Sequence, residues 1–257
     1  MSTADGASRE VVAEFAHIGV TAFTTTRADG DYAPDSGAAG PGANALDSAA
    51  AGSGAHALWH RLAATVDAHT VRLASARQVH GARVVSHADD WSGWRRADDA
   101  DGHWSAARGT ACAITVADCV PIFLAQARGA VAILHAGWRG TVARILSAGV
   151  DRFLENGITA TELHMHLGPA ICGRCYRVGA DVFEQLTGWP TSRERHVDLR
   201  ALLAEQAAAL GVRHVSVSAS CTRCDNDRFY SHRAGDAGRQ VAVIATPSDS
   251  GGGVTHP

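Results

Sequence analysis

Three residues that can bind a metal each stand at the end of an apolar, strand-like run. They are His80 in SARQVHG, Cys119 in AITVADCVP and His135 in VAILHAGWRG. Two histidines and one cysteine form a ligand set of the catalytic zinc type, in which three protein ligands leave a fourth position for water or substrate. The long, uneven spacing is not itself a zinc motif, so the prediction requires the three run ends to converge in the fold.

The same three residues also fit a cysteine hydrolase, with Cys119 as the nucleophile and His135 or His80 as its base. Asp118 directly precedes Cys119, and on a strand its side chain would point to the opposite face. Two interpretations of Asp118 stay open: a carboxylate that orients a metal ligand, or a turn residue before Val120-Pro121.

The segment HAGWRGT, residues 135–141, joins a strand end to an amphipathic helix through two glycines and an arginine. Free N–H groups where a helix begins can bind an anion. The planar, permanently charged guanidinium of Arg139 suits phosphate. The alternative is that Gly137 and Gly140 only form a tight turn and that Arg139 pairs with a carboxylate. The favoured interpretation places a bound anion beside the metal.

Two Cys-x-x-Cys pairs, Cys172/Cys175 and Cys221/Cys224, follow later in the chain. Paired knuckles of this kind can form a structural Cys₄ zinc site. Neither pair has a glycine after its second cysteine, so ordinary core or turn cysteines are favoured. A second metal site and a disulfide in either pair are the alternatives. His164 and His166 share one strand face, which can bind metal but more often packs beside a core.

Alternating strands and helices must position these residues. A 3.6-residue apolar period predicts a helix over 141–155, and Asp198 is a good N-cap for a second amphipathic helix. Further helices are expected over 57–66 and 179–187. Residues 28–56 read as a long loop, and the polar, Trp-rich stretch 89–110 as an exposed connection. Apolar runs predict strands at 20–26, 71–79, 82–86, 112–116, 121–125, 130–134, 163–167, 212–218 and 240–245.

Strands and helices interleave with no linker long enough to separate two domains. The sequence therefore predicts one α/β domain with a mixed sheet over residues 1–257. The Gly/Ser-rich end, residues 246–257, is expected to be a flexible tail.

Composition excludes several classes of function. Hydrophobic residues make up 46% of the 257 residues, and the formal net charge is only −3. Nucleic acid and anionic membranes are therefore poor candidates for a partner. All 23 basic residues are Arg, which excludes a Schiff-base lysine and a P-loop nucleotide site. The absence of a signal-peptide core and of a membrane-spanning run predicts a cytoplasmic enzyme.

The chain resembles the bacterial YfiH-like proteins, also called laccase-domain or multicopper polyphenol oxidase-like proteins. The resemblance extends from Phe23 to about Ile244. It is most specific in the combination of ADCVP with HAGWRG. The matching segments are QVHG (78–81), TVADCVPIFLA (115–125), HAGWRGT (135–141), LGPAIC (167–172), CYRVG (175–179), CT (221–222), FYSHR (229–233) and GRQ (238–240).

This resemblance implies a single domain of four layers, α/β/β/α, with a zinc site at His80, Cys119 and His135. It implies phosphorolysis of adenosine, inosine and methylthioadenosine, in which phosphate attacks the anomeric carbon as the purine leaves. It also implies hydrolytic deamination of adenosine, with zinc activating water for attack at the purine amino carbon. The small-molecule substrates would then be a purine nucleoside and phosphate. The residues implied to bind them are Arg139, Arg27, Gln78 and Arg233.

The chain departs from the family pattern in three places. Its TTTRADGDYAP segment keeps Arg27 but lacks the second glycine of the family and the stretch that follows. Arg177 stands where the family usually has Glu in Tyr-Glu-Val-Gly, which would reverse a charge near the pocket. The usual Ser-Tyr-Arg-Arg reads Ser231-His232-Arg233-Ala234 here. These changes leave the metal ligands intact and the preferred nucleoside open.

Two further classes of function remain as alternatives. A copper-dependent polyphenol oxidase usually needs about ten histidines in paired motifs, whereas the 14 histidines here include one His-x-His pair, at 164 and 166. Zinc is therefore favoured over copper. A non-enzymatic binding module that retains the site would show no turnover of any nucleoside.

Overall fold

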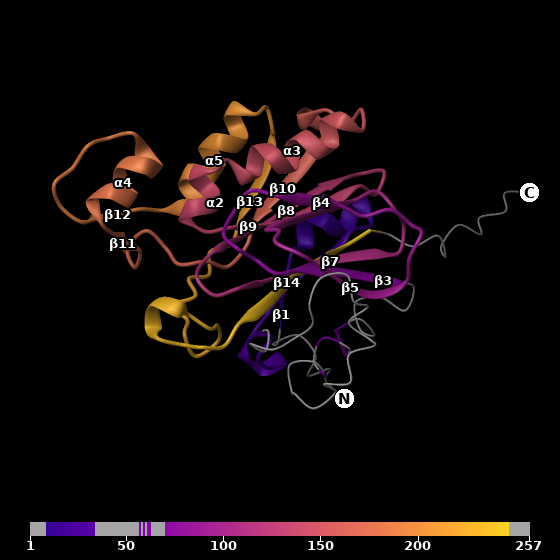
Figure 1. Ribbon diagram of the computed structural model, residues 1–257, viewed down its shortest axis with the longest axis horizontal. Helices are drawn as coiled ribbons and strands as arrows, with labels where there is room; N and C mark the ends of the chain where they lie inside the picture. Colours follow the sequence, from indigo (N-terminus) through magenta and orange to yellow (C-terminus); the bar gives the residue numbers. More distant parts are fainter. Residues whose placement is uncertain (1–8, 34–56, 58, 60, 63–69, 247–257) are drawn as a thin grey trace, which may run out of the picture.

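A computed structural model of the protein describes residues 9–33, 57, 59, 61–62 and 70–246 (Figure 1). Most of the predicted helix over 57–66 and most of the predicted loop over 28–56 lie outside the described residues. So does the predicted flexible tail, apart from Thr246.

The first of two six-stranded sheets contains strands from both ends of the described chain and from its middle. Its order is β1-β2-β14-β7-β3-β5, antiparallel from β1 to β7 and parallel from β7 to β5. The strands are β1 (Arg9–Val11), β2 (Thr21–Thr25), β14 (Gln240–Ala245), β7 (Thr110–Val116), β3 (Arg72–Ala76) and β5 (Gly93–Ala97).

The second sheet carries the strands nearest the predicted site. Its order is β13-β10-β8-β9-β6-β4, with parallel pairs at its two edges and antiparallel pairs between them. The strands are β13 (His214–Val217), β10 (Leu163–Leu167), β8 (Val120–Gln126), β9 (Val131–Ala136), β6 (Gly102–Ser105) and β4 (Val84–Ser86). Both sheets are mixed; the interleaved strands and helices predict one mixed sheet, and the resemblance implies two.

Helices cover the outer face of the second sheet, while α4 lies further out beside a two-stranded ribbon (Figure 1). The helices are α2 (Trp138–Val142), α3 (Ile145–Glu155), α4 (Ala180–Thr187) and α5 (Leu199–Ala209), and the ribbon is β11 (Arg177–Val178) with β12 (Arg195–His196). Short 3₁₀ turns are η1 (Ala13–Ile18), η2 (Arg27–Asp29), η3 (Ala160–Glu162) and η4 (His232–Ala234). The Asp198 carboxylate caps α5 by accepting the N–H groups of Arg200 and Ala201, as predicted.

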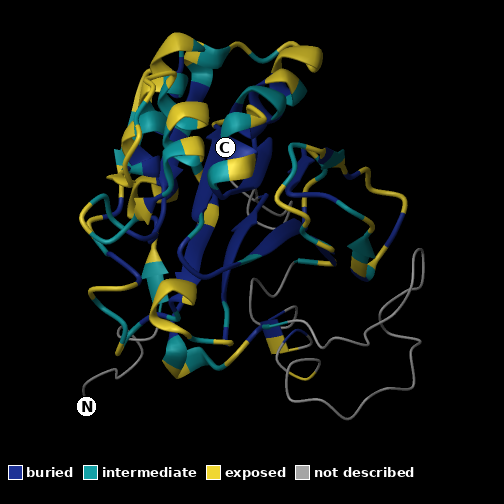
Figure 2. Ribbon diagram, turned by 60° about the vertical axis from the view of Figure 1, so that its left-hand side comes forward, coloured by how far each residue is buried: buried dark blue, intermediate teal, exposed yellow. Residues whose placement is uncertain are grey.

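Apolar side chains fill the spaces between the layers. Ile114 of β7 and Ile244 of β14 pack with Phe123 and Ile133 of the second sheet between the two sheets. Strands β8 and β9 are buried at every position, because the first sheet covers one face and the helices the other. Figure 2 shows these buried strands beneath helices with exposed outer faces.

The helix–sheet contact requires a small residue in α3. A Cβ added at Gly149 would lie 2.5 Å from Cδ1 of Leu134 in β9, so the helix packs against the sheet through its backbone. Trp59 and Leu62 belong to a cluster on the outer face of the first sheet. The fold is a mixed α/β single domain in which two mixed sheets face each other and helices cover the second sheet, in agreement with the fold that the resemblance implies.

Two predicted elements differ from the structure. Residues 89–110 are not an exposed connection, because they contain β5 and the fully buried β6. The stretch was predicted to be exposed because it is polar, but some of its polar residues are buried. His103, for example, is buried, and its ring nitrogen lies 2.9 Å from a ring nitrogen of His87. The predicted helix over 141–155 begins earlier, as α2, and is interrupted at Arg144, whose φ is 63°.

Candidate metal centre

The three predicted ligands converge at one end of the two sheets. His80 lies between β3 and β4, Cys119 in the turn between β7 and β8, and His135 within β9. Their ligand atoms all lie within 4.8 Å of one another. The register explains the contact, because Val120 of β8 pairs with Ala136 of β9 and so brings Cys119 beside the end of β9. Strands distant in the sequence thus assemble a compact His-Cys-His set.

The turn before β8 aims Cys119 by an unusual backbone conformation. Asp118 has a φ of 80° and His80 a φ of 61°, in the left-handed region that non-glycine residues rarely adopt. The Asp118 carboxylate accepts the Thr222 hydroxyl at 2.6 Å and the Arg233 N–H at 2.7 Å. Asp118 is therefore a turn residue whose carboxylate anchors two later loops, and the partners that it bonds, Thr222 and Arg233, are not metal ligands.

Asp101 holds two of the three ligands in place. Its carboxylate lies 2.8 Å from Nδ1 of His135 and accepts the backbone N–H groups of His80 and Gly81 at 2.9 and 2.7 Å. Strand β6 puts it there, because the residue after Asp101 pairs with Leu134 of β9. Since Asp101 occupies Nδ1, Nε2 of His135 remains for a metal or for Cys119. Metal-binding histidines are commonly oriented by such a carboxylate.

The electrostatics of the centre favour a thiolate. Burial alone would raise the pKa of Cys119, but the positive charge of His135 and hydrogen bonds from His135 and His80 outweigh it and lower the pKa to about 6. Burial opposes the charge on His135, yet the Cys119 thiolate and Asp101 raise its pKa to about 9. Without metal, the two form an ion pair at neutral pH.

The donor set and the space around it fit a zinc ion. Imidazole nitrogen and thiolate sulfur are the donors that zinc prefers in proteins, and three of them leave one position open. Gly137 provides room: a Cβ there would lie 2.9 Å from Sγ of Cys119 and 3.1 Å from Cδ2 of His80. Gly137 therefore permits close approach of the chain and does more than form a tight turn.

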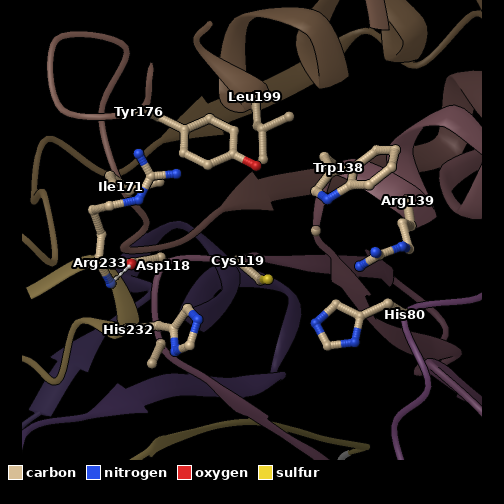
Figure 3. Close-up of a pocket in the computed structure, with 12 residues that line it drawn as sticks. His80, Asp118, Cys119, Trp138, Arg139, Ile171, Tyr176, Leu199, His232 and Arg233 are labelled. Carbon is tan, nitrogen blue, oxygen red and sulfur yellow. Dashed lines mark hydrogen bonds between the residues drawn. The ribbon is translucent and has the colours of Figure 1, made fainter. Parts of the chain in front are cut away.

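Two pockets meet at this centre. Both include His80, Ala117, Cys119 and His232 in their walls. One, of about 280 Å³, is completed by Asp118, Gly137, Trp138, Arg139, Ile171, Tyr176, Leu199 and Arg233 (Figure 3). The other, of about 460 Å³, is completed by Ala33, Ala76, Arg77, Gln78, Arg96, Thr115, His135, Ala237 and Arg239.

Four side chains are predicted to bind substrate. Two of them, Arg139 and Arg233, line the smaller pocket. Arg139 lies over the ring of Trp138 at 4.5 Å, and in the described part of the chain no carboxylate pairs with it. Arg233 donates to the Arg177 carbonyl at 2.8 Å and lies over the Tyr176 ring. Because α2 has only five residues, positive charge near the pocket comes mainly from these two arginines rather than from a helix dipole.

The other two predicted binding residues are held by the protein itself. Gln78 lines the larger pocket, but its amide bonds to the Thr115 backbone at 2.8 Å through both its nitrogen and its oxygen. Arg27 pairs with Asp236 and donates to the Asn226 carbonyl, and it is absent from the walls of both pockets. Its guanidinium supports the chain segment before His232.

Arg177 does not reverse the charge of the pocket. Its guanidinium pairs with Glu194 at 2.8 Å, and its side chain is 62% exposed. The other two departures do reach the pockets: His232 lines both, and Ala33 of the altered TTTRADGDYAP segment lines the larger one.

The histidines of β10 serve the fold rather than a second metal group. The His164 ring stacks on His214 with centroids 4.7 Å apart, and His166 bonds to the Ser216 hydroxyl at 2.8 Å. Within the described residues they belong to no metal-type group of three or more ligands.

Sequence reasoning missed Asp101, Trp138 and Tyr176 as parts of the site. Asp101 directly precedes a strand, but that strand was not predicted, which concealed the signal. Burial, followed by the nearby Cys119 thiolate, raises the pKa of Tyr176 to about 12, so its hydroxyl keeps its proton.

Among the described residues, no helix has the length and apolar character needed to cross a bilayer.

Known proteins of similar sequence include purine nucleoside enzymes. The chain is 38% identical over 202 residues to a purine nucleoside phosphorylase of Deinococcus radiodurans, covering 74% of this chain and 77% of that protein. It is 34% identical over 185 residues to adenosine deaminase RL5 from an unknown prokaryotic organism, covering 63% and 69%.

Solved structures share the fold along nearly the whole chain. The YfiH protein of Bacillus licheniformis superposes with a TM-score of 0.76 at 24% identity, covering 95% of this chain and 98% of that one. YlmD from Geobacillus stearothermophilus superposes with a TM-score of 0.74 at 26% identity, covering 96% and 98%. A model of the multi-copper polyphenol oxidoreductase laccase family matches residues 21–247. The chain therefore belongs to this laccase-like family, whose YfiH members it resembles in fold.

Proposed function

We propose that the protein is a zinc-dependent purine nucleoside phosphorylase that also deaminates adenosine. The observation that carries this proposal is the juxtaposition of the His80-Cys119-His135 set, which opens to the smaller pocket, with Arg139, a cation without a carboxylate partner among the described residues. The names of the relatives supply the substrate class, since they include both a phosphorylase and a deaminase.

His80, Cys119 and His135 would hold the zinc ion, which when bound supplies a Lewis acid and activates water for deamination. Arg139 and Arg233 would bind phosphate at the smaller pocket, where their charge offsets that of the nucleophile. As phosphate forms its bond to the anomeric carbon, the bond to the purine nitrogen breaks and the base leaves with the electron pair. The Tyr176 hydroxyl lines the same pocket and stays protonated at neutral pH, so it would donate a hydrogen bond to phosphate.

The metal ligands support zinc over copper. A phenol oxidase needs further copper ions beyond the first, usually held by clustered histidines. In the described residues the second metal-type group consists of four cysteines and contains no histidine. The family description therefore supports copper-dependent oxidation less strongly than the names of the relatives support nucleoside chemistry.

One observation favours a cysteine hydrolase as a second candidate. Cys119 has a lowered pKa, His135 is its partner, and Asp101 orients that histidine, which is the order of groups in a nucleophilic triad. This scheme assigns no essential role to His80. The two functions therefore differ in what they require of His80 and of a metal.

A nucleoside panel tests the proposal. Adenosine, inosine and methylthioadenosine are incubated with zinc-loaded protein, with and without phosphate, and the products are read by mass spectrometry. Free base that forms only with phosphate, together with the matching sugar 1-phosphate (5-methylthioribose 1-phosphate in the case of methylthioadenosine), supports phosphorolysis, and inosine from adenosine without phosphate supports deamination. Cys119→Ala should abolish both, whereas Cys112→Ala, in the β7 core, should not. Equal rates in the wild type and Cys119→Ala would exclude the metal-centred mechanism.

A further inference from the structure

Four cysteines from two loops meet on the same side of the second sheet. Strands β10 and β13 pair in parallel, so the loops that follow them leave the same edge of the sheet. The first loop carries Cys172 and Cys175, and the second carries Cys221 and Cys224. A parallel bridge between Ala170 and Cys221 joins the two loops directly.

The four sulfur atoms form one group and not two separate pairs. All four lie within 4.8 Å of one another, and the Cys175 and Cys224 sulfurs are 3.5 Å apart. Zinc–sulfur bonds of about 2.3 Å in a tetrahedron put neighbouring sulfurs about 3.8 Å apart. The cluster therefore needs only small side-chain adjustments to surround one zinc ion. The sequence favoured ordinary turn cysteines, and the structure instead groups all four.

Backbone N–H groups point at the sulfur that lies deepest. The Cys221 sulfur accepts the N–H of Cys224 at 3.4 Å, within its own knuckle, and the N–H of Cys172 at 3.3 Å, from the other loop. Metal-bound sulfur commonly accepts such N–H groups. The backbone of both loops is thus arranged around the Cys221 sulfur.

Each knuckle also contains an arginine. Arg174 stands in Cys-Gly-Arg-Cys and Arg223 in Cys-Thr-Arg-Cys. In the described part of the chain neither guanidinium forms an ion pair with a carboxylate. Four thiolates around a Zn²⁺ ion carry a net charge of −2, which two neighbouring cations offset.

We propose that Cys172, Cys175, Cys221 and Cys224 bind a structural zinc ion, separate from the ion held at His80, Cys119 and His135. Binding replaces four S–H bonds with four zinc–sulfur bonds and releases four protons to solvent, without oxidation or reduction. With all four positions filled by protein sulfur, this ion has no open position for substrate.

The proposed ion would brace one wall of the smaller pocket. Tyr176 directly follows the first knuckle and lines that pocket. Thr222 lies within the second knuckle and donates to Asp118, next to Cys119. The Ile171 N–H, just before the first knuckle, donates to the Asp118 carbonyl at 3.0 Å. One zinc ion would thus fix both loops that hold the turn on which Cys119 lies.

Zinc content and sulfur coordination of a His80→Ala/Cys119→Ala double variant, purified natively without added metal, test the proposal. This variant lacks two ligands of the first centre and keeps all four clustered cysteines. We expect one tightly bound zinc per chain, and an X-ray absorption spectrum that fits four sulfur neighbours at about 2.3 Å. The wild type should hold up to two zinc ions per chain, with mixed nitrogen and sulfur neighbours on average.

A Cys175→Ser/Cys224→Ser variant gives the complementary result. It should lose the all-sulfur zinc and become more sensitive to proteolysis in the segments 168–178 and 218–234. Cys112→Ala, a change of a buried cysteine outside both groups, should retain all bound zinc. If the double variant at His80 and Cys119 holds no zinc, or if the intact mass shows two disulfides among the four cysteines, the proposal is wrong. Neither outcome bears on the nucleoside activity proposed for the first centre.

Discussion

A single carboxylate, Asp101, lies 2.8 Å from Nδ1 of His135 and also accepts the backbone N–H of His80 at 2.9 Å. One buried side chain therefore fixes the ring of one ligand and the backbone of another. The residue is 21 positions from His80 and 34 from His135. The sequence alone indicates neither contact, yet Asp101 links two of the three predicted metal ligands.

Asp101→Asn should weaken zinc binding. The amide keeps the size of the carboxylate but loses the charge that supports His135, and removal of such a partner costs about 10- to 100-fold in metal affinity. Competition with a chromophoric chelator measures the change. Asp99→Asn is the matched control, because the Asp99 side chain is half exposed and pairs with Arg77. Equal zinc affinity in both variants would show that Asp101 does not orient the ligand.

Gly137→Ala should damage the centre by steric contact alone. Gly137 has a φ of −79° and a ψ of −179°, a conformation open to any residue, so the substitution causes no backbone strain. The new methyl group would lie 2.9 Å from the Cys119 sulfur and would displace it from the ligand set. Zinc affinity and nucleoside turnover should both fall, with the circular dichroism spectrum unchanged.

Gly81→Ala is the control for this substitution. A Cβ at Gly81 meets its nearest neighbours at 3.6 and 3.7 Å, which is ordinary van der Waals contact. Gly81→Ala should bind zinc like the wild type although it lies one residue from His80. Similar losses of zinc affinity in Gly137→Ala and Gly81→Ala would mean that steric contact with the Cys119 sulfur does not explain the effect at Gly137.

In metal-free protein, the rate of alkylation at Cys119 should follow the fraction of this thiol that is ionised. Its pKa is lowered from the ordinary value of 9.0 to about 6, so the thiolate is present above pH 6 and is lost as the pH falls through that value. The rate of carboxamidomethylation at Cys119, read by peptide mass spectrometry, should therefore rise across pH 5 to 7 and level off near neutrality. Burial raises the pKa of Cys112 to about 12, so that thiol should stay unmodified. A rate at Cys119 that rises only near pH 9 would contradict the ion pair with His135.

Arg139→Gln should raise the KM for phosphate more than it lowers kcat. Loss of a charged hydrogen bond costs about 1.5–3 kcal/mol, which corresponds to about 10- to 100-fold in KM. Arg177→Gln is the control, since Arg177 pairs with Glu194 outside the pocket. Steady-state kinetics at varied phosphate measure both. An unchanged phosphate KM in Arg139→Gln would place the phosphate elsewhere, with the basic side chains of the larger pocket as the next candidates.

The sequence predicted the elements with a clear apolar signal and missed those without one. Strands β8 and β9 are continuous apolar runs because both faces are covered. The buried face of α3 shows as a 3.6-residue period. Strand β6 contains the buried polar residues His103 and Ser105, and both form hydrogen bonds with His87, which lies 16 and 18 positions away. A polar residue satisfied by a remote partner reads as exposed when only its neighbours are known.

The candidate ligands could be predicted from residue type, but their convergence could not. His80, Cys119 and His135 meet because of strand register, which depends on pairing between distant runs. Arg27 shows the converse: it is the residue that the divergent TTTRADGDYAP segment keeps, and only the structure reveals that Asp236 pairs with its guanidinium. The four clustered cysteines meet because β10 pairs in parallel with β13, a pairing between strands about 50 residues apart that local patterns do not specify.

The most direct test of the account is the release of adenine from adenosine by wild-type protein, measured with phosphate before and after chelation and again after zinc is restored. We expect phosphate-dependent release of adenine with an equal amount of ribose 1-phosphate, lost on chelation and recovered with zinc. Release that is unaffected by chelation, or no release of adenine by zinc-loaded protein at any phosphate concentration, would contradict the assignment of His80, Cys119 and His135 as the metal centre of a nucleoside phosphorylase.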